Sequence, residues 1–421
     1  MLLQISGIVP SLFGIRVEFI LFALTLIGVA IFHKHTMYVA LAGLFSILVF
    51  KYIVFSDFSF YLHVVGSTGV EGEWGTLVNL TGLLLGFAIL SRVFELSGVP
   101  DKLPQYLPGD WKGGLILLLM IMILSTFLDN IAAALIGGSM ALVVFKGRVH
   151  IGYLAAIVAA SNAGGAGSVL GDTTTTLMWI DGVSPVDVLH GFIASFAAFA
   201  VFGVFASIQQ QKYQPIQIGA TEGVKVDVGL LIIVIGILAG AIASNFLVSM
   251  PALGVWVAIL VGAIFRKLPW KEVPHAITGT IFLLSLVTCA SLMPVEELPP
   301  ASWESSLVLG FVSSVFDNIP LTKLCLEQGG YDWGLLAYAV GFGGSMIWFG
   351  SSAGVALSNK FHEAKSVIRY LRHGWHVTLA YVIGFFVLLG VLGFHPGEKR
   401  GMNTREKAEV QMVQPGKESE K

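Results

Sequence analysis

Long apolar runs, separated by short polar or glycine-rich breaks, dominate the pattern of this sequence. A membrane-spanning helix needs about 20 mostly apolar residues. Backbone that leaves the helix is tolerated inside a membrane only where protein or water covers it. We therefore expect an all-α polytopic membrane protein of about ten to thirteen membrane segments, some of them broken or re-entrant. The candidate segments lie near residues 17–32, 38–55, 77–97, 113–129, 130–146, 151–180, 186–208, 227–247, 251–266, 274–293, 300–317, 334–358 and 373–394.

The polar segments between these runs predict the rest of the organisation. Residues 99–112 contain three prolines, which predicts an interfacial loop or short helix, and the basic, aromatic residues 360–376 are typical of a membrane surface. From Gly397 onward the chain is charged and lacks apolar periodicity, so we expect a disordered tail over 396–421. One apparent span separates the basic residues 360–372 from this tail, so the positive-inside rule gives no orientation from the sequence. No basic region precedes the first apolar run, so we expect it to remain as a membrane helix.

The composition supports a membrane protein and argues against several other classes. Of the 421 residues, 55% are hydrophobic and 12% are charged, and the mean hydropathy is +0.82, whereas a soluble domain usually carries about 25% charged residues. The net charge of -2 argues against a nucleic-acid partner. The sequence has no CxxC pair, no His-Glu-x-x-His zinc motif, no phosphate-binding Gly-Lys-Ser/Thr and no nucleophile elbow in a soluble setting. We therefore expect neither an enzyme nor a bound cofactor.

A seven-residue motif occurs twice, each time inside a long apolar run. The first copy, at residues 125–131, reads STFLDNI, and the second, at residues 313–319, reads SSVFDNI. Each copy holds two hydroxyls, two apolar residues and then Asp-Asn-Ile. The two acids are Asp129 and Asp317.

Each copy is followed by a break rich in glycine and serine. The first break, residues 161–168, reads SNAGGAGS, and the second, residues 343–354, reads GGSMIWFGSSAG. The distance along the chain is 33 residues from Asp129 to Asn162 and 34 residues from Asp317 to Ser351. Paired interruptions in two halves of a transporter point to its central site, so we expect two repeats, of inverted topology. The break glycines are Gly164, Gly165 and Gly167, and Gly343, Gly344 and Gly350.

These residues suit the coupling of a cation to a proton. An ionised Asp deep in a membrane is costly, so both acids should face a polar cavity, a cation or a partner group, unless they only cap half-helices. Sodium prefers oxygen ligands, and removal from water favours the protonated form of a carboxylate. Competition between Na⁺ and H⁺ for one carboxylate is enough for exchange. The candidate ligands are Asp129, Asn130, Asn162, Asp172, Thr173, Asp317, Asn318, Ser351 and Ser352, with Ser125, Thr126, Ser313 and Ser314 as further hydroxyls, and Na⁺ is expected at Asp129, Asn162 and Asp317.

Three other polar residues each have two interpretations. Asp172 precedes four consecutive threonines, 173–176, and either caps the helix they begin or joins the site. Asp181 is typical of a turn. Lys323 lies six residues after Asp317 and breaks the similarity of the two motifs; it either extends to a membrane interface or pairs with Asp317 as a tethered cation.

Residues 161–180, SNAGGAGSVLGDTTTTLMWI, closely resemble the signature of NhaD-type sodium/proton antiporters, which belong to the ion transporter superfamily with a citrate-transporter-like domain. The Asp-Asn motifs at 129–130 and 317–320 resemble that family's paired helix motifs, and residues 341–355 are similar to its second glycine-rich hairpin. The resemblance runs from about residue 80 to 395. The chain departs from the family pattern at Phe342 and Trp348, over 285–300, and at Lys323.

This resemblance implies exchange of Na⁺ or Li⁺ for H⁺ by alternating access. It also implies a homodimer with a scaffold, a mobile transport domain, two re-entrant hairpins and an elevator-like motion. Residues 1–76 would then form N-terminal scaffold helices, 77–208 the first repeat and 209–395 the second repeat. The expected partners are inorganic cations and the lipid bilayer, and the expected location is a bacterial inner membrane.

Three rival functions remain open at this point. Sodium-coupled carboxylate transporters of the same superfamily carry Ser-Asn-Thr at both hairpin tips, whereas the corresponding segments here, 161–163 and 351–353, read SNA and SSA. An arsenite or other oxyanion exporter would need a central cation, for which Lys323 is the candidate. A membrane-embedded protease could use paired aspartates, but the Asp-Asn-Ile context and the duplicated breaks fit that class poorly.

Overall fold

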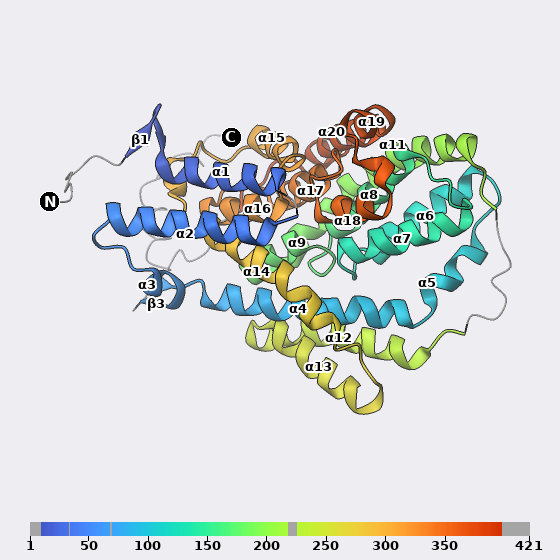
Figure 1. Cartoon of the computed structure of the whole chain (residues 1–421), viewed down its shortest axis with the longest axis horizontal. Helices are drawn as coiled ribbons and strands as arrows, with labels where there is room; N and C mark the ends of the chain where they lie inside the picture. The colour runs from blue at the N-terminus through green and yellow to red at the C-terminus, as the bar shows by residue number, and fades with distance from the viewer. Residues whose placement is uncertain (1–9, 33, 68–69, 218–224, 398–421) are drawn as a thin grey trace, which may run out of the picture.

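The computed structural model describes residues 10–32, 34–67, 70–217 and 225–397. Helices running mostly along one long axis make up nearly all of the fold (Figure 1). Two short antiparallel hairpins near the N-terminus are the strands that the described residues form: β1 (Ser11–Leu12) pairs with β2 (Ile15–Arg16), and β3 (Gly66–Ser67) with β4 (Val70–Glu71).

The helices fall into an N-terminal group, two longer series and a hairpin between the series. The N-terminal helices are α1 (Val17–Ile31), α2 (Thr36–Val54) and α3 (Phe60–Val65). The first series is α4 (Trp74–Leu96), α5 (Val99–Lys102), η1 (Leu103–Tyr106), α6 (Trp111–Leu124), α7 (Asn130–Val144), α8 (Ile151–Gly165), α9 (Thr173–Ile180), α10 (Pro185–Leu189) and α11 (Gly191–Tyr213). The hairpin is α12 (Val228–Val248) and α13 (Pro251–Phe265). The second series is α14 (Glu272–Ser291), η2 (Val295–Glu297), α15 (Trp303–Ser313), α16 (Asn318–Gln328), α17 (Trp333–Gly343), α18 (Ser352–Lys360), η3 (His362–Lys365), α19 (Val367–His373) and α20 (Trp375–Leu392).

Apolar helices confirm that the chain is an all-α membrane protein. Six described helical segments are long and apolar enough to cross a membrane, namely α2, α4, α10 with α11, α12, α14 and α20. Shorter apolar helices are α1, α6, α7, α8, α13 and α17. Two of the expected segments are broken, as their glycine-rich stretches predicted: 151–180 divides into α8 and α9, and 334–358 divides into α17 and α18. Glycine-rich backbone causes both divisions, because glycine favours breaks over continued helix.

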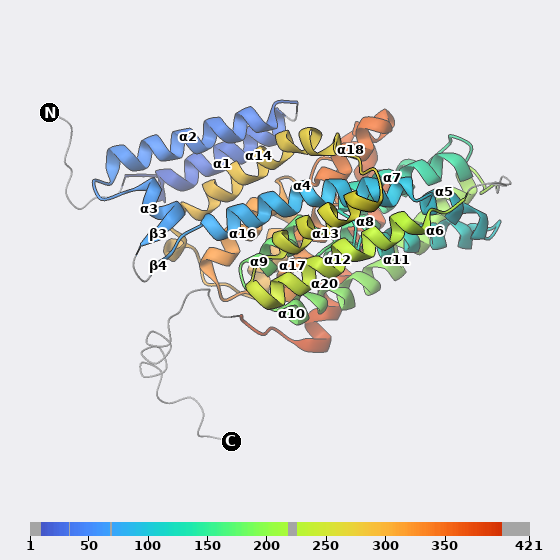
Figure 2. The same cartoon turned by 90° about the horizontal axis from the view of Figure 1, so that it is seen from below.

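Helices from the two series pack against each other in a crossed manner. α9 of the first series packs against α16 of the second, and α18 of the second packs against α7 of the first. α11 packs along α20, and α4 along α14. The hairpin α12–α13 covers α4, while α1 and α2 lie together beside α14 (Figure 2).

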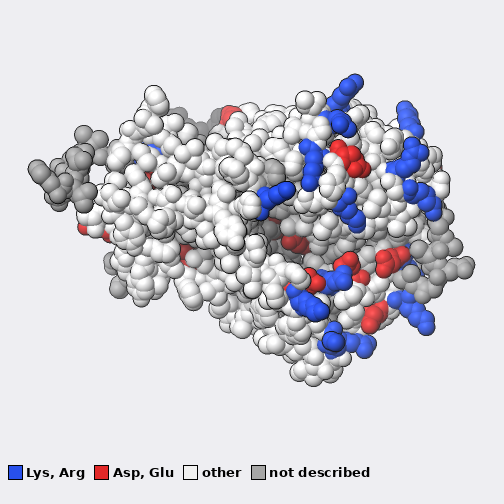
Figure 3. All heavy atoms as spheres, viewed as in Figure 1, with Lys and Arg blue, Asp and Glu red and all other residues white. Residues whose placement is uncertain are grey.

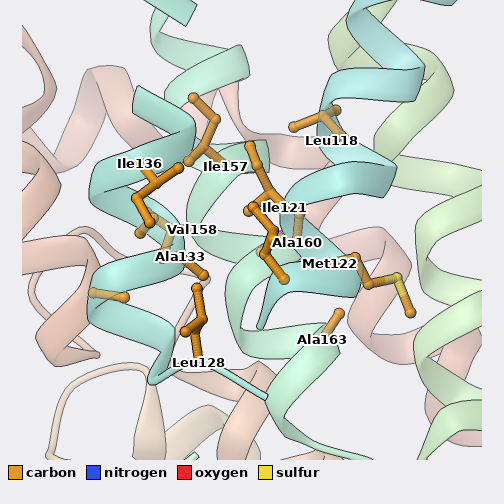
Figure 4. Packing of buried hydrophobic residues seen from close by; sticks show 14 of the residues in the cluster. Leu118, Ile121, Met122, Leu128, Ala133, Ile136, Ile157, Val158, Ala160 and Ala163 are labelled. Atoms are coloured by element: carbon orange, nitrogen blue, oxygen red, sulfur yellow. The ribbon is translucent and has the colours of Figure 1, made fainter. Parts of the chain in front are cut away.

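An apolar core holds α6, α7 and α8 together next to the first Asp-Asn motif. Figure 4 shows Ile121 of α6, Ile136 of α7 and Ile157 of α8 in this core, and Ile121 and Ile157 are fully buried. A Cβ on Gly137 would lie 2.3 Å from the Cδ1 of Ile121, so α6 and α7 approach closely at this point. The core therefore fixes the helix ends from which the polar residues of the first motif project.

Basic side chains gather at one end of the molecule, called the basic end below (Figure 3). This end consists of the loops at the start of α6, between α7 and α8, after α11, between α13 and α14, and from α18 to α20 (Figure 1). Contacts connect these loops, such as the rings of His150 and His373, whose centroids are 5.0 Å apart. Its basic residues are Lys102, Lys112, Lys146, Arg148, Lys212, Arg266, Lys267, Lys271, Lys360, Lys365, Arg369 and Arg372.

The opposite end, called the acidic end, carries mostly carboxylates. Its described acidic residues include Asp57, Asp187, Glu296, Glu297, Glu304 and Asp332, whereas its described basic residues are Arg16, Lys51 and Lys323. α20 runs from the basic end to the acidic end. The predicted tail, 396–421, lies outside the described residues except for its first two positions.

Candidate ion site at four helix N-termini

Four helices that follow the motifs and breaks each begin at a polar side chain that caps the first turn. Aspartates cap three of them: the backbone N–H two residues further on donates to Oδ1 of Asp129 at 2.9 Å for α7, of Asp172 at 3.2 Å for α9 and of Asp317 at 3.1 Å for α16. For α18, the N–H of Gly354 donates to Oγ of Ser351 at 3.2 Å. A helix N-terminus carries partial positive charge and unpaired N–H groups, so carboxylates are stabilised at these positions.

Serines of the two motifs fasten the preceding helices to the breaks. Ser125 donates to the carbonyl of Ser161 at 2.5 Å, and Ser313 donates to the carbonyl of Val340 at 2.7 Å. Both bonds are buried and join the end of one helix, α6 or α15, to the second helix after it, α8 or α17. The neighbouring hydroxyls of Thr126 and Ser314 donate to carbonyls of their own helices. All four hydroxyls that the sequence offered as ligands therefore hold helix ends in place.

The break glycines lie where the backbone of another segment approaches closely. A Cβ on Gly164 would lie 2.0 Å from the carbonyl oxygen of Met122, and one on Gly343 would lie 2.3 Å from that of Gly310. Side chains or backbone also lie within 3 Å of the Cβ position of the other predicted break glycines, which are Gly165, Gly167, Gly344 and Gly350. Larger residues would separate the helices at these positions, which explains the need for glycine.

A buried chain of amides and a hydroxyl crosses between the two series. The side-chain N–H₂ of Asn130 donates to Oδ1 of Asn162 at 3.1 Å, and the N–H₂ of Asn162 donates to Oγ of Ser345 at 2.9 Å. All three side chains are buried. Ser345 was not among the predicted ligands, although its hydroxyl inside the second glycine-rich break could have suggested it.

The predicted acids line two different cavities. Asp129 and Asp172 line a cavity of about 20 Å³ together with Thr173 and apolar side chains of α4, which is room for about one water-sized occupant. Asp317 lines a cavity of about 280 Å³ with Ser351 and Ser352. Asp172 is close enough to both Asp129 and Asp317 for their charges to interact, so the three acids belong to one region.

One oxygen of Asp172 is available for a ligand. Its Oδ2 is buried and has no hydrogen-bond partner among the described residues. This atom lies 3.4 Å from the position that a Cβ on Gly341 would take. A buried carboxylate oxygen without a donor is unfavourable, so a proton or a cation would stabilise it.

The predicted correspondence between Asn162 and Ser351 is wrong. Asp172 in the first break takes the place that Ser351 takes in the second, because each caps the helix that follows its break. Asn162 of the first series contacts Ser345 of the second. In the equivalent contact, with the two series exchanged, Gly341 approaches Ala166, so Gly341 is the counterpart of Asn162. The spacing misled because α7 and α8 have 15 residues each whereas α16 and α17 have 11 each, so counting from the motif does not locate the tip.

Comparisons with known proteins found several similar sequences. No protein-family model matches the chain. The chain is 24% identical over 321 residues to the Na(+)/H(+) antiporter NhaD of Vibrio cholerae, covering 63% of this chain and 67% of that protein. It is 24% identical over 325 residues to the NhaD of Alkalimonas amylolytica, with 63% and 66% covered. It is 28% identical over 280 residues to sodium/proton antiporter 1 of Arabidopsis thaliana, with 55% and 48% covered.

The chain resembles NhaD-type sodium/proton antiporters. The predicted resemblance is thereby confirmed, and these relatives are named as transporters rather than as enzymes. The matched region spans only about half to two thirds of the length of these relatives.

The NhaD-type signature at 161–180 forms the end of α8, the tip and the whole of α9. Its threonines mainly fasten the tip: Thr175 donates to the carbonyl of Ser168 at 2.6 Å, and Thr176 donates to that of Val169 at 2.8 Å. Thr174 donates to Asp172 at 3.3 Å. The capping role of Asp172 is therefore present, together with its place on the cavity.

Lys323 is a position where the chain departs from the NhaD-type pattern. The structure contradicts both roles predicted for it. Its side chain is 1% exposed, so it does not extend to an interface. Its ammonium lies 2.9 Å from Glu73, 3.6 Å from Asp181 and 2.5 Å from Glu327. Asp317 is not among the ion-pair partners of Lys323 in the described part of the chain. Asp181 ends α9 as expected of a turn residue, but it also belongs to this buried cluster.

Proposed function

We propose that this protein exchanges Na⁺ or Li⁺ for H⁺ across the membrane by alternating access. The observation that carries the proposal is the set of three carboxylates, the buried Asp172 and the half-buried Asp129 and Asp317, that begin helices beside two cavities. A site with excess negative charge in a membrane needs a counter-charge. Na⁺, Li⁺ or H⁺ supplies it, and competition among them couples their movement. The names of the relatives support the same exchange.

A carboxylate or oxyanion substrate fits this site poorly. Free helix N-termini attract anionic substrates in other transporters, but acidic side chains occupy three of the four N-termini here. Lys323 was the candidate cation for an oxyanion, and its ammonium contacts Glu73, Asp181 and Glu327 instead. Nothing in the described residues favours these alternatives.

We propose further that the two series of helices are inverted repeats with re-entrant hairpins at α8–α9 and α17–α18. The matching caps and the matching Ser125 and Ser313 bonds support a repeat. The proposed division is N-terminal helices over 1–76 as part of the scaffold, the first repeat over 77–208 and the second over 209–395. An elevator-like motion of the motif helices and a homodimer complete the proposal.

The charge distribution supports an orientation, which the sequence alone left open. Loops on the cytoplasmic side of membrane proteins carry excess Lys and Arg. We therefore propose that the basic end faces the cytoplasm of a bacterial inner membrane, with the acidic end outside. The cavity of Asp317 reaches Thr36 and Asn359, close to the exposed Lys360 at the basic end. This conformation would accordingly admit cations from the cytoplasm.

Cysteine labelling tests this orientation. Cys289 and Cys325 are buried, so a new cysteine at an exposed position reports its own side. We expect Asp57→Cys to react with a membrane-impermeant maleimide on intact cells, and Lys267→Cys to react only after the membrane is opened. The reverse pattern would contradict the orientation and leave the exchange reaction unaffected.

Proton movement in everted vesicles tests the exchange itself. A dye sensitive to the pH difference is quenched by respiration, and Na⁺, Li⁺, K⁺ and citrate are then added in turn. We expect Na⁺ or Li⁺ to restore fluorescence without citrate, in vesicles from cells that lack other antiporters. The absence of any cation response, with Na⁺ uptake seen only when citrate is present, would instead support a carboxylate transporter.

A further inference from the structure

A buried ion cluster around Lys323 joins three separate helices at the acidic end. Lys323 lies on α16, Asp181 ends α9, and Glu73 immediately precedes α4. The fourth member, Glu327, lies on α16 itself, one turn after Lys323. The exposed fractions of the side chains are 1% for Lys323, 3% for Asp181 and 15% for Glu73. Pairs in such buried surroundings are screened less by water than surface pairs.

The two helices that meet at this cluster begin at the ion site. α9 starts at Asp172 and ends at Asp181, and α16 starts at Asp317 and carries Lys323 on its second turn. The two helices pack against each other along their length. The contact between Lys323 and Asp181 therefore connects the end of α9 that is remote from the site with the middle of α16, and constrains how the N-termini of the two helices sit.

The matching pair of helices, α18 and α7, has a much weaker link. Lys360, at the end of α18, donates to the hydroxyl of Ser139 on α7 at 2.6 Å, and this bond is exposed. A single exposed hydrogen bond contributes little. The cluster at the acidic end is thus the stronger polar link between motif helices.

We propose that Lys323 is a positioning residue for the ion site, which acts through Asp181 and Glu73 to hold α9 and α16 in register against α4. This inference rests on the proposed exchange function and names a residue that governs its site. In the described part of the chain Lys323 forms no ion pair with Asp172 or Asp317, so its effect is transmitted by the two helices.

Two neutral substitutions separate a link between helices from simple charge balance. Asp181→Asn weakens the ion pair that joins α16 to α9. Glu327→Gln also removes one carboxylate charge from beside the ammonium of Lys323, but this pair lies within α16 and joins no other helix. We expect Asp181→Asn to raise the apparent KM for Na⁺ about tenfold, the effect of losing a contact between neighbouring groups. We expect Glu327→Gln to leave the KM within about twofold of the wild type, because this pair lies within one helix.

Hydrogen exchange gives a second measurement that does not depend on transport. We expect amides of residues 173–180 to exchange faster in purified Asp181→Asn than in wild type, and to remain unchanged in Glu327→Gln. Lys323→Met should behave as Asp181→Asn in both measurements. The double variant, Lys323→Met with Asp181→Asn, should be no worse than either single variant. Lys323→Arg should have the KM and the hydrogen exchange of the wild type. If Lys323→Met does not fold, the comparison of Asp181→Asn with Glu327→Gln decides alone.

Equal effects of Asp181→Asn and Glu327→Gln on hydrogen exchange and on KM would overturn the positioning role. An unchanged KM in Asp181→Asn would do the same. A wild-type protein that exchanges no cation would overturn the proposed function together with the positioning role, and this outcome is recognised before any variant is compared.

Discussion

Asp129→Asn is expected to reduce cation/proton exchange to the level of vesicles without the protein, while the protein stays folded. Asparagine caps helices about as well as aspartate, so its Oδ1 can still accept the N–H of Ile131 that caps α7. The amide carries no charge for Na⁺ and cannot bind and release a proton. Dye dequenching by Na⁺ measures the activity, and size-exclusion chromatography in detergent measures folding.

A matched control exists at the protein surface. Asp110 caps α6 by accepting the N–H of Lys112 at 3.0 Å, and its side chain is exposed. We expect Asp110→Asn to keep full exchange, because it changes a capping aspartate outside the site. We expect Asp317→Asn to lose exchange as Asp129→Asn does. Retained exchange in both Asp129→Asn and Asp317→Asn would move the coupling group elsewhere, with Asp172 as the next candidate.

Gly164→Ala is expected to cause the largest loss of stability among single substitutions at the breaks. The new Cβ would lie 2.0 Å from the carbonyl oxygen of Met122 and 2.9 Å from the Cβ of Ser125. Backbone cannot yield as a flexible side chain can, and the buried bond from Ser125 to Ser161 holds the same two helices together. We expect a loss of about 3 kcal/mol or more, measured as a lower midpoint of thermal unfolding in detergent.

The control for this substitution is Gly236→Ala in α12. A Cβ at Gly236 would meet nothing within 4 Å, and alanine favours a helix over glycine by about 1 kcal/mol. We expect its unfolding midpoint to match or exceed that of the wild type. Wild-type stability in Gly164→Ala would show that α6 and α8 separate easily, and would contradict the close packing of the first break.

Local signals in the sequence predicted the helices and their interruptions. Apolar runs gave the membrane helices, and the Asp-Asn motifs marked helix starts at Asp129 and Asp317 because capping depends on neighbouring residues. Glycine and serine marked both breaks. The tip of the first break was misplaced, because residues 161–163 belong to α8 and the interruption covers 166–172.

Partners that are far apart in the sequence could not be predicted. Lys323 pairs with Glu73, which lies 250 residues earlier, and only the packing of α9 against both α16 and α4 brings the charges together. Arg16 likewise pairs with Glu297, which lies 281 residues later. The orientation could not be predicted from the sequence for a related reason. The loops that form the basic end are dispersed along the chain and gather only in the fold.

Proton release on addition of Na⁺ to the purified protein tests most directly whether cation and proton compete for the same carboxylates. The protein is placed in weakly buffered detergent solution, and NaCl or choline chloride is added while the pH is followed. Competition predicts that Na⁺ releases protons, that choline does not, and that Asp129→Asn abolishes the release. Binding of Na⁺, detected as heat, without any release of protons would contradict the account.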